Sequence, residues 1–286
     1  LGVTVKGSTR WLNLPGFRLQ VSEIVKFAVV VYIAGFVTRH HRSMIESFYE
    51  LVQPFLLLSA ACALLLLEPD LGSVVVIVVI SMGGMFLGGL WLRQFAILTV
   101  GIILMVVLAV VFSEYRQRRI NSFLDPWKDP FGDGFQLVQS LISFGQGEWV
   151  GVGLGAGVQK LFYIPEGHTD FLFSIVAEEL GFVGVLSVIL LFASIVWRAF
   201  VIAVLAERVG KKFAAFIAYG LGVWFGFQAF VNMGVNMGLL PTKGLTLPLM
   251  SYGGSSMIIM CCALSLLYRV NTDVQSAMLQ GKREKR

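Results

Sequence analysis

Long apolar runs separated by short polar segments dominate the chain. Each run has about 17 residues or more, which is enough for a helix to cross a hydrocarbon core of about 30 Å. The pattern therefore predicts an all-α polytopic integral membrane protein, a helical bundle of seven transmembrane helices. The predicted spans are residues 21–38, 51–67, 73–91, 95–113, 170–198, 212–238 and 248–268.

The composition agrees with this pattern. Hydrophobic residues make up 57% of the chain and charged residues only 14%, whereas soluble domains have about 25% charged residues. The net charge of +5 is typical of basic cytoplasmic loops, so we do not expect nucleic-acid binding. The three cysteines (Cys62, Cys261 and Cys262) lie in apolar runs without metal-like spacing, which favours a packing role. The chain begins at Leu1 and has no signal peptide, so we expect an N-terminal truncation.

The basic residues of the connections predict the orientation. If the spans alternate, most of these residues fall on one side, which we assign to the cytoplasm. They are Arg39, Arg42, Arg93, Arg198, Arg208, Lys211, Lys212, Arg269, Lys282, Arg283, Lys285 and Arg286. The opposite side then holds 1–20, the turn 68–70, the long loop 114–169 and the loop 239–247. Three arginines in the long loop count against a pure charge rule.

Ionisable groups gather in "YIPEGHTDFLFSIVAEELG", residues 163–181, where Glu166, His168 and Asp170 precede an apolar span. Asp170, or Thr169, could simply cap the helix that begins there. Alternatively, Asp170 is a general base at the rim of a cavity, wet enough to ionise and close enough to lipid to have a raised pKa. His168 could tune that carboxylate, bind substrate or be merely solvated.

Other polar groups also admit two interpretations. Glu178 is expected about 12 Å deeper along the same helix, facing either the bundle interior or a neighbouring helix. Glu23 and Lys26 are three residues apart, so they share a helix face and form either a packing clamp or part of a cavity wall. The turn Glu68-Pro69-Asp70 is either hydrated or a weakly indicated cation site.

A second polar patch is "LLPTKGLTLPLMSYGGSS", residues 239–256. Lys243 is either a solvated anchor or an ammonium that neutralises a phosphate. Ser251 and Ser255, with the glycines between them, permit close helix packing or offer backbone N–H groups to an anion. The glycines of "GVGLGAGVQK" (151–160) do not fit a dinucleotide-binding fingerprint, and no Walker A sequence is present.

Together, "RRINSFLDPWKDPFGDGFQLVQSL", "GHTDFLFSIVAEELGFVG" and "LLPTKGLTLPLMSYGGSS" closely resemble the SEDS (shape, elongation, division and sporulation) family. The resemblance runs from about Gly2 to Val270 and is closer to the cell-division member than to the elongation member. It implies one transmembrane domain over 1–286, with 114–169 as a large extracytoplasmic loop. The family has ten transmembrane helices, so the seven spans are expected to be its fourth to tenth.

The resemblance also implies a function. The family polymerises lipid II into peptidoglycan strands at the periplasmic face of the inner membrane, by inverting transfer that releases undecaprenyl pyrophosphate. The cell-division member works at the septum with a class B penicillin-binding protein and other divisome proteins. The family's essential aspartate falls on Asp170, and its Glu/Lys pair falls on Glu23 and Lys26. This chain has Val21 where the family usually has Pro, and Glu68 where it has Gln.

We therefore expect Asp170 to be catalytic. The expected substrate-binding residues are Glu23, Lys26, Arg119, Lys160, Glu166, His168, Lys243, Ser251 and Ser255. Lys243, Arg119, Lys160 or a divalent cation (Mg²⁺ or Mn²⁺) could stabilise the leaving pyrophosphate, and the metal requirement stays open. Two alternatives remain at this point: a lipid II flippase, and a non-catalytic scaffold for the penicillin-binding protein.

Overall fold

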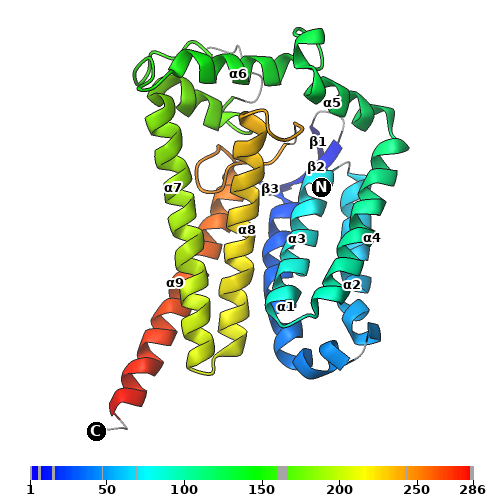
Figure 1. Cartoon of the computed structure of the whole chain (residues 1–286), viewed down its shortest axis with the longest axis vertical. Coiled ribbons are helices and arrows are strands. Elements are labelled where there is room, and N and C mark those ends of the chain that lie inside the picture. Colours follow the sequence, from blue (N-terminus) through cyan, green and yellow to red (C-terminus); the bar gives the residue numbers. More distant parts are fainter. Residues whose placement is uncertain are drawn as a thin grey trace. The chain divides into compact units, whose positions relative to one another are not determined.

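The computed structural model describes residues 2–5, 8–14, 17–46, 48–68, 70–159, 167–242 and 244–283. Within them, one helix forms on each predicted apolar run, which confirms the all-α membrane fold (Figure 1). Four helices contain stretches long and apolar enough to cross a membrane, and three contain shorter apolar stretches. The helices are α1 (Val21–Glu46), α2 (Phe48–Leu67), α3 (Leu71–Leu87), α4 (Leu92–Val111), α7 (Leu172–Arg208), α8 (Lys212–Asn236) and α9 (Gly254–Arg283).

Two segments fold in ways that the sequence analysis did not predict. Residues 2–20, left without structure, contain a three-stranded antiparallel sheet of β1 (Gly2–Val5), β2 (Ser8–Leu14) and β3 (Phe17–Gln20). Leu14 pairs with Phe17 across the Pro15-Gly16 sequence, which is an ordinary hairpin signal. The long loop contains α5 (Glu114–Leu124), the 3₁₀ helix η1 (Pro126–Lys128) and α6 (Phe135–Gly147).

The start of the last helix was predicted six residues too early. α9 begins at Gly254 rather than at Pro248 and continues to Arg283. Before it, the Leu247 N–H donates to Ser251 Oγ (2.8 Å), and the Ser251 N–H donates to the Leu247 carbonyl (3.0 Å). These bonds close a turn before the helix. Because the residues around this turn are apolar, the sequence analysis had included it in the span.

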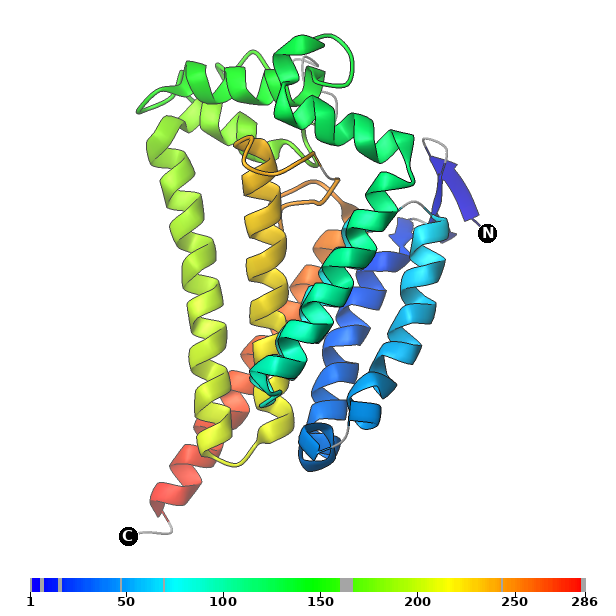
Figure 2. The same cartoon turned by 45° about the vertical axis from the view of Figure 1, so that its right-hand side comes forward.

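The chain contacts divide into two compact units, which are described separately. Unit 1 comprises Leu1–Ala96, Ser194–Phe227 and Gly254–Arg286, and unit 2 comprises Ile97–Ala193 and Gln228–Gly253. In unit 1, α1 packs against α2, α3 and α9, and both views show α1 beside α2 (Figures 1 and 2). Gly84 of α3 and Gly88, which follows its last residue, permit the close approach of α3 to α1. An added Cβ would lie 2.7 Å from Ile33 at Gly84 and 2.4 Å from Val37 at Gly88.

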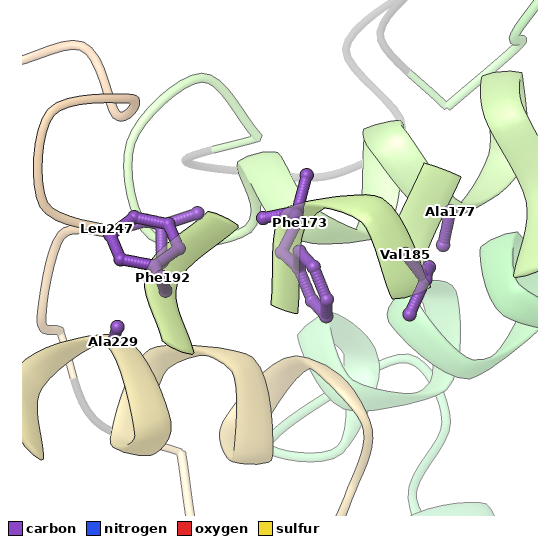
Figure 3. Close-up of a cluster of buried hydrophobic side chains, with 7 residues drawn as sticks. Phe173, Ala177, Val185, Phe192, Ala229 and Leu247 are labelled. Atoms are coloured by element: carbon purple, nitrogen blue, oxygen red, sulfur yellow. The ribbon is translucent and has the colours of Figure 1, made fainter. Parts of the chain in front are cut away.

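The hydrophobic core of unit 2 contains residues from both segments that the sequence analysis singled out as polar, 163–181 and 239–256. It contains side chains from α7, one from α8 and one from the loop before α9 (Figure 3). Its buried members are Phe173, Ala177, Val185, Val188, Phe192, Ala229 and Leu247. This cluster holds the start of α7 against α8 and the 239–253 segment.

α7 is broken at Gly181, which has φ 62° and ψ −158°. The break removes two intrahelical hydrogen bonds, and the segment after α6 replaces both. The N–H groups of Val152 and Gly153 donate to the carbonyls of Glu178 and Glu179 (3.0 and 3.1 Å). In return, the N–H groups of residues 182 and 183 donate to the carbonyls of residues 148 and 149 (2.9 and 3.1 Å). These four backbone groups of α7 are therefore satisfied, which matters near lipid, where an unsatisfied group costs several kcal/mol.

This exchange explains the glycine-rich sequence 151–157. At Gly151, φ is +80°, and an added Cβ would lie 2.1 Å from the Glu179 carbonyl oxygen. At Gly181, an added Cβ would lie 2.4 Å from the backbone nitrogen of Gly151. Gly151 therefore serves close backbone contact with α7.

We expect Gly151→Ala to destabilise the protein by at least about 2 kcal/mol, because the added methyl meets a carbonyl and the positive φ is strained. Gly145→Ala is the matched control, since its Cβ would meet nothing within 4 Å on α6. Thermal unfolding in detergent measures both. Equal unfolding midpoints would contradict the close packing of residue 151 on α7.

Candidate functional site

Asp170 lies in the short segment that leads into α7, and its side chain is half-buried. The neighbouring His168 is exposed, and its carbonyl accepts a hydrogen bond from the Tyr252 N–H (3.0 Å). The two polar segments singled out in the sequence therefore meet in unit 2, as predicted for the loop 239–247 and the start of the fifth span.

Two asparagines of α8 hold the main chain of Asp170. Asn232 Nδ2 and Asn236 Nδ2 donate to the Asp170 carbonyl at 2.8 and 2.9 Å. Both asparagines are buried. The sequence analysis missed them, although Gln228, Asn232 and Asn236 recur every four residues along one face of an otherwise apolar helix. That polar stripe was the available signal.

The first turn of α7 is satisfied from α8. Because α7 begins at Leu172, the residue before it is Phe171 rather than Thr169 or Asp170. Asn236 Oδ1 accepts hydrogen bonds from Ser174 N–H (3.1 Å) and from Ser174 Oγ (2.6 Å). Ser140 of α6 donates to the Asn236 carbonyl (2.6 Å). Asn236 therefore performs a capping function for which the sequence analysis had considered Thr169 and Asp170.

The Asp170 carboxylate faces Gly244. A Cβ added at Gly244 would lie 3.1 Å from Asp170 Oδ2, so the carboxylate packs closely against this glycine. The loop before it is held by Arg119, whose Nη1 donates to the Thr242 carbonyl (3.2 Å). Arg119 thus has a loop-anchoring contact, and its predicted contact with substrate stays a prediction. Three further predicted residues lie outside the described residues: Lys160, Glu166 and Lys243.

Glu178 lies three residues before the break in α7. Its buried carboxylate accepts the N–H of Val158 (2.7 Å) and, at longer distance, that of Gln159 (3.3 Å). Both residues belong to the loop after α6, so the predicted partner on a neighbouring helix was wrong. Glu178 fastens the loop to the start of α7.

In unit 1, Glu23 and Lys26 form the predicted pair, with Nζ 2.8 Å from Oε1. The Lys26 side chain is fully buried, and its ammonium lies 5.7 Å from the centre of the Trp224 ring. α1 begins at Val21, and the first helical position accepts proline as readily as valine. The difference from the family at Val21 therefore leaves the pair intact.

Three buried oxygens near the starts of α1 and α9 have no hydrogen-bond partner among the described residues. They are Ser22 Oγ, Glu23 Oε2 and Ser255 Oγ. An unpaired carboxylate oxygen is costly when buried, and a water or a ligand hydroxyl would satisfy it. Glu23 and Ser255 therefore keep their predicted binding role as a prediction, whereas Ser251 closes the turn described above.

The turn 68–70 has a structural role at Asp70. Its buried carboxylate accepts the Ser73 N–H (3.2 Å) and the Ser73 hydroxyl (2.8 Å), so Asp70 is the N-cap of α3 rather than a hydrated group. In the part of the chain that the structure describes, no three His, Cys, Asp or Glu side chains gather as metal ligands.

Known proteins resemble this chain along almost its whole length. A family model described as "Cell cycle protein", which covers FtsW, RodA and SpoVE, matches residues 1–276. The "Probable peptidoglycan glycosyltransferase FtsW" of Methylomonas methanica is 56% identical over 99% of this chain and 74% of its own length. The protein of the same description from Methylococcus capsulatus is 52% identical over 99% and 71%.

Solved structures show the same fold. One is a chain from a study of the structural coordination of polymerization and crosslinking by a peptidoglycan synthase complex. It is 33% identical, with a TM-score of 0.77 over 96% of this chain and 76% of its own. The Thermus thermophilus rod shape determining protein RodA is 28% identical, with a TM-score of 0.67 over 96% and 72%.

Proposed function

Because the chain belongs to the cell cycle protein family of FtsW, RodA and SpoVE, we propose that it is a multi-pass membrane peptidoglycan glycosyltransferase that polymerises lipid II. The relatives of more than 50% identity are described as FtsW, which agrees with the resemblance to the cell-division member. The observation that carries the chemistry is the half-buried Asp170. Its main chain is fixed by Asn232 and Asn236, and its carboxylate lies against Gly244 of the 239–247 loop.

In the proposed reaction, Asp170 is the general base. It accepts the proton of the 4-hydroxyl of the acceptor's N-acetylglucosamine, while that oxygen attacks the anomeric carbon of the donor's terminal N-acetylmuramic acid. The bond from that carbon to the pyrophosphate breaks, and undecaprenyl pyrophosphate leaves with the electron pair. An α-linked donor gives a β-linked product, so a single inverting displacement suffices. A positioned base contributes about 10²–10⁴-fold to such a rate.

The leaving pyrophosphate needs positive charge. Lys243, next to Gly244 in the sequence, and Lys160 remain candidates, and Arg119 can act from α5, beside the loop that it anchors at Thr242. If a divalent cation takes part, it would stabilise the negative charge of the leaving group.

We place the reaction at the periplasmic face of the inner membrane, at the division septum. The basic connections favour this orientation of the helices. A class B penicillin-binding protein is the proposed partner, because cross-linking must follow polymerisation and a similar chain was studied within a synthase complex.

The test is a polymerisation assay on the protein purified in detergent together with its penicillin-binding partner, whose transpeptidase site is inactivated. Lipid II should be converted into glycan strands, with one undecaprenyl pyrophosphate released for each bond formed. A preparation that moves lipid II across liposome membranes but forms no strands would support a flippase instead. A preparation that only binds the partner would support a scaffold.

A further inference from the structure

The side-chain amide of Asn232 joins two segments that are far apart in the sequence. Its Nδ2 donates one hydrogen bond to the Asp170 carbonyl (2.8 Å) and another to the Leu245 carbonyl (2.6 Å). Leu245 directly follows Gly244, where an added Cβ would lie 3.1 Å from Asp170 Oδ2. A single buried group therefore sets the distance between the main chain of Asp170 and the loop that faces its carboxylate.

The chemistry of the neighbours fixes the orientation of this amide. Both contacts of Asn232 Nδ2 are carbonyl oxygens, which only accept hydrogen bonds, so the NH₂ group must point toward them. Both N–H bonds of the NH₂ group are then used. Asn236 is fixed in the same way, because its Nδ2 meets the carbonyls of Asp170 and Asn232 while its Oδ1 accepts from Ser174.

We infer that Asn232 is a positioning residue for glycosyl transfer, which sets the Asp170 carboxylate against the 242–247 loop. This inference rests on the proposed role of Asp170 as the general base. Asn232 contacts main-chain carbonyls and not the reacting atoms, so it acts through Asp170. A misplacement of about 1 Å in a reacting group can cost about 10²-fold in rate.

Gln228 offers a matched control one turn earlier on the same helix. It is also buried, and its Nε2 donates to the Thr246 carbonyl (3.0 Å). Gln228 thus holds the same loop through the same chemistry, at Thr246. If Asn232 mattered only for stability, replacing either side chain with an apolar one would have similar effects.

The experiment compares Asn232→Leu with Gln228→Met in the lipid II polymerisation assay, on the complex with the penicillin-binding partner. We expect Asn232→Leu to lower kcat about 10²-fold with little change in the KM for lipid II, and Gln228→Met to lower kcat much less. Thermal unfolding midpoints of both variants are measured beside the rates. If Asn232→Leu does not fold, Asn232→Ser, which keeps one donor, is judged by the same comparison.

Three outcomes can be told apart when Asp170→Asn is run in the same assay. If Asp170→Asn is inactive and kcat falls selectively in the Asn232 variant, the inference stands. If Asp170→Asn is inactive but the two α8 variants lose equal activity, or the loss in the Asn232 variant lies in KM, Asn232 is structural and the inference fails. If Asp170→Asn retains the wild-type rate, the general-base proposal itself fails.

Discussion

Glycan-strand formation is expected to be lost when Asp170 is replaced by asparagine, in a protein that still folds and still binds its partner. Asparagine keeps the shape of the side chain and removes the carboxylate that accepts the proton. The hydrogen bonds from Asn232 and Asn236 go to the main-chain carbonyl of residue 170, so they survive the substitution. The rate should fall by about 10²-fold at least, the lower limit for loss of a general base.

The measurement is the rate of lipid II polymerisation by the purified complex, with thermal unfolding recorded for each preparation. Asp133→Asn is the control, because Asp133 is an exposed carboxylate in the same long loop, and it should polymerise at the wild-type rate. A wild-type rate for Asp170→Asn would mean that the carboxylate is not the base.

The apolar pattern was sufficient to predict the seven helices of the apolar runs, because spanning a membrane imposes length and composition on each of them. The Glu23–Lys26 pair was predictable for a similar reason, since a three-residue spacing places both side chains on one face of α1. The meeting of the Asp170 segment with the 239–253 loop also followed from alternating topology.

The other features of the fold and of the candidate site depended on contacts between segments distant in the sequence. The break at Gly181 requires a partner for each freed backbone group, and that partner lies some thirty residues away in the loop after α6. No local periodicity reports such an exchange. The partner of Glu178 was wrongly predicted for the same reason, because it lies in the loop after α6 and not on a neighbouring helix. Asn232 and Asn236 were visible as a polar stripe on α8, but the carbonyls that they bind could be known only from the fold.

The largest expected effect on stability is at the buried pair of Glu23 and Lys26. Lys26→Met leaves the Glu23 carboxylate buried without its cation, and breaking a buried pair from one side costs about 3–5 kcal/mol. Glu23→Gln leaves the Lys26 ammonium with the Trp224 ring but without its counter-charge. The double variant carries no charge at residues 23 and 26. Its free energy of unfolding should therefore lie well above the value that the two single losses predict when added.

A double-mutant cycle on thermal or denaturant unfolding in detergent measures this coupling. The exposed pair Arg269–Asp273, at 3.2 Å on α9, is the control, because surface pairs contribute about 1 kcal/mol or less. If single changes at residues 23 and 26 were as mild as those on α9, the pair would not be a buried clamp.

The activity of the double variant then separates the two interpretations of the pair. A stable double variant that polymerises lipid II has lost only a packing clamp. A stable double variant that does not polymerise has lost part of the wall that binds the substrate, which would also give the unpaired Oε2 of Glu23 a ligand.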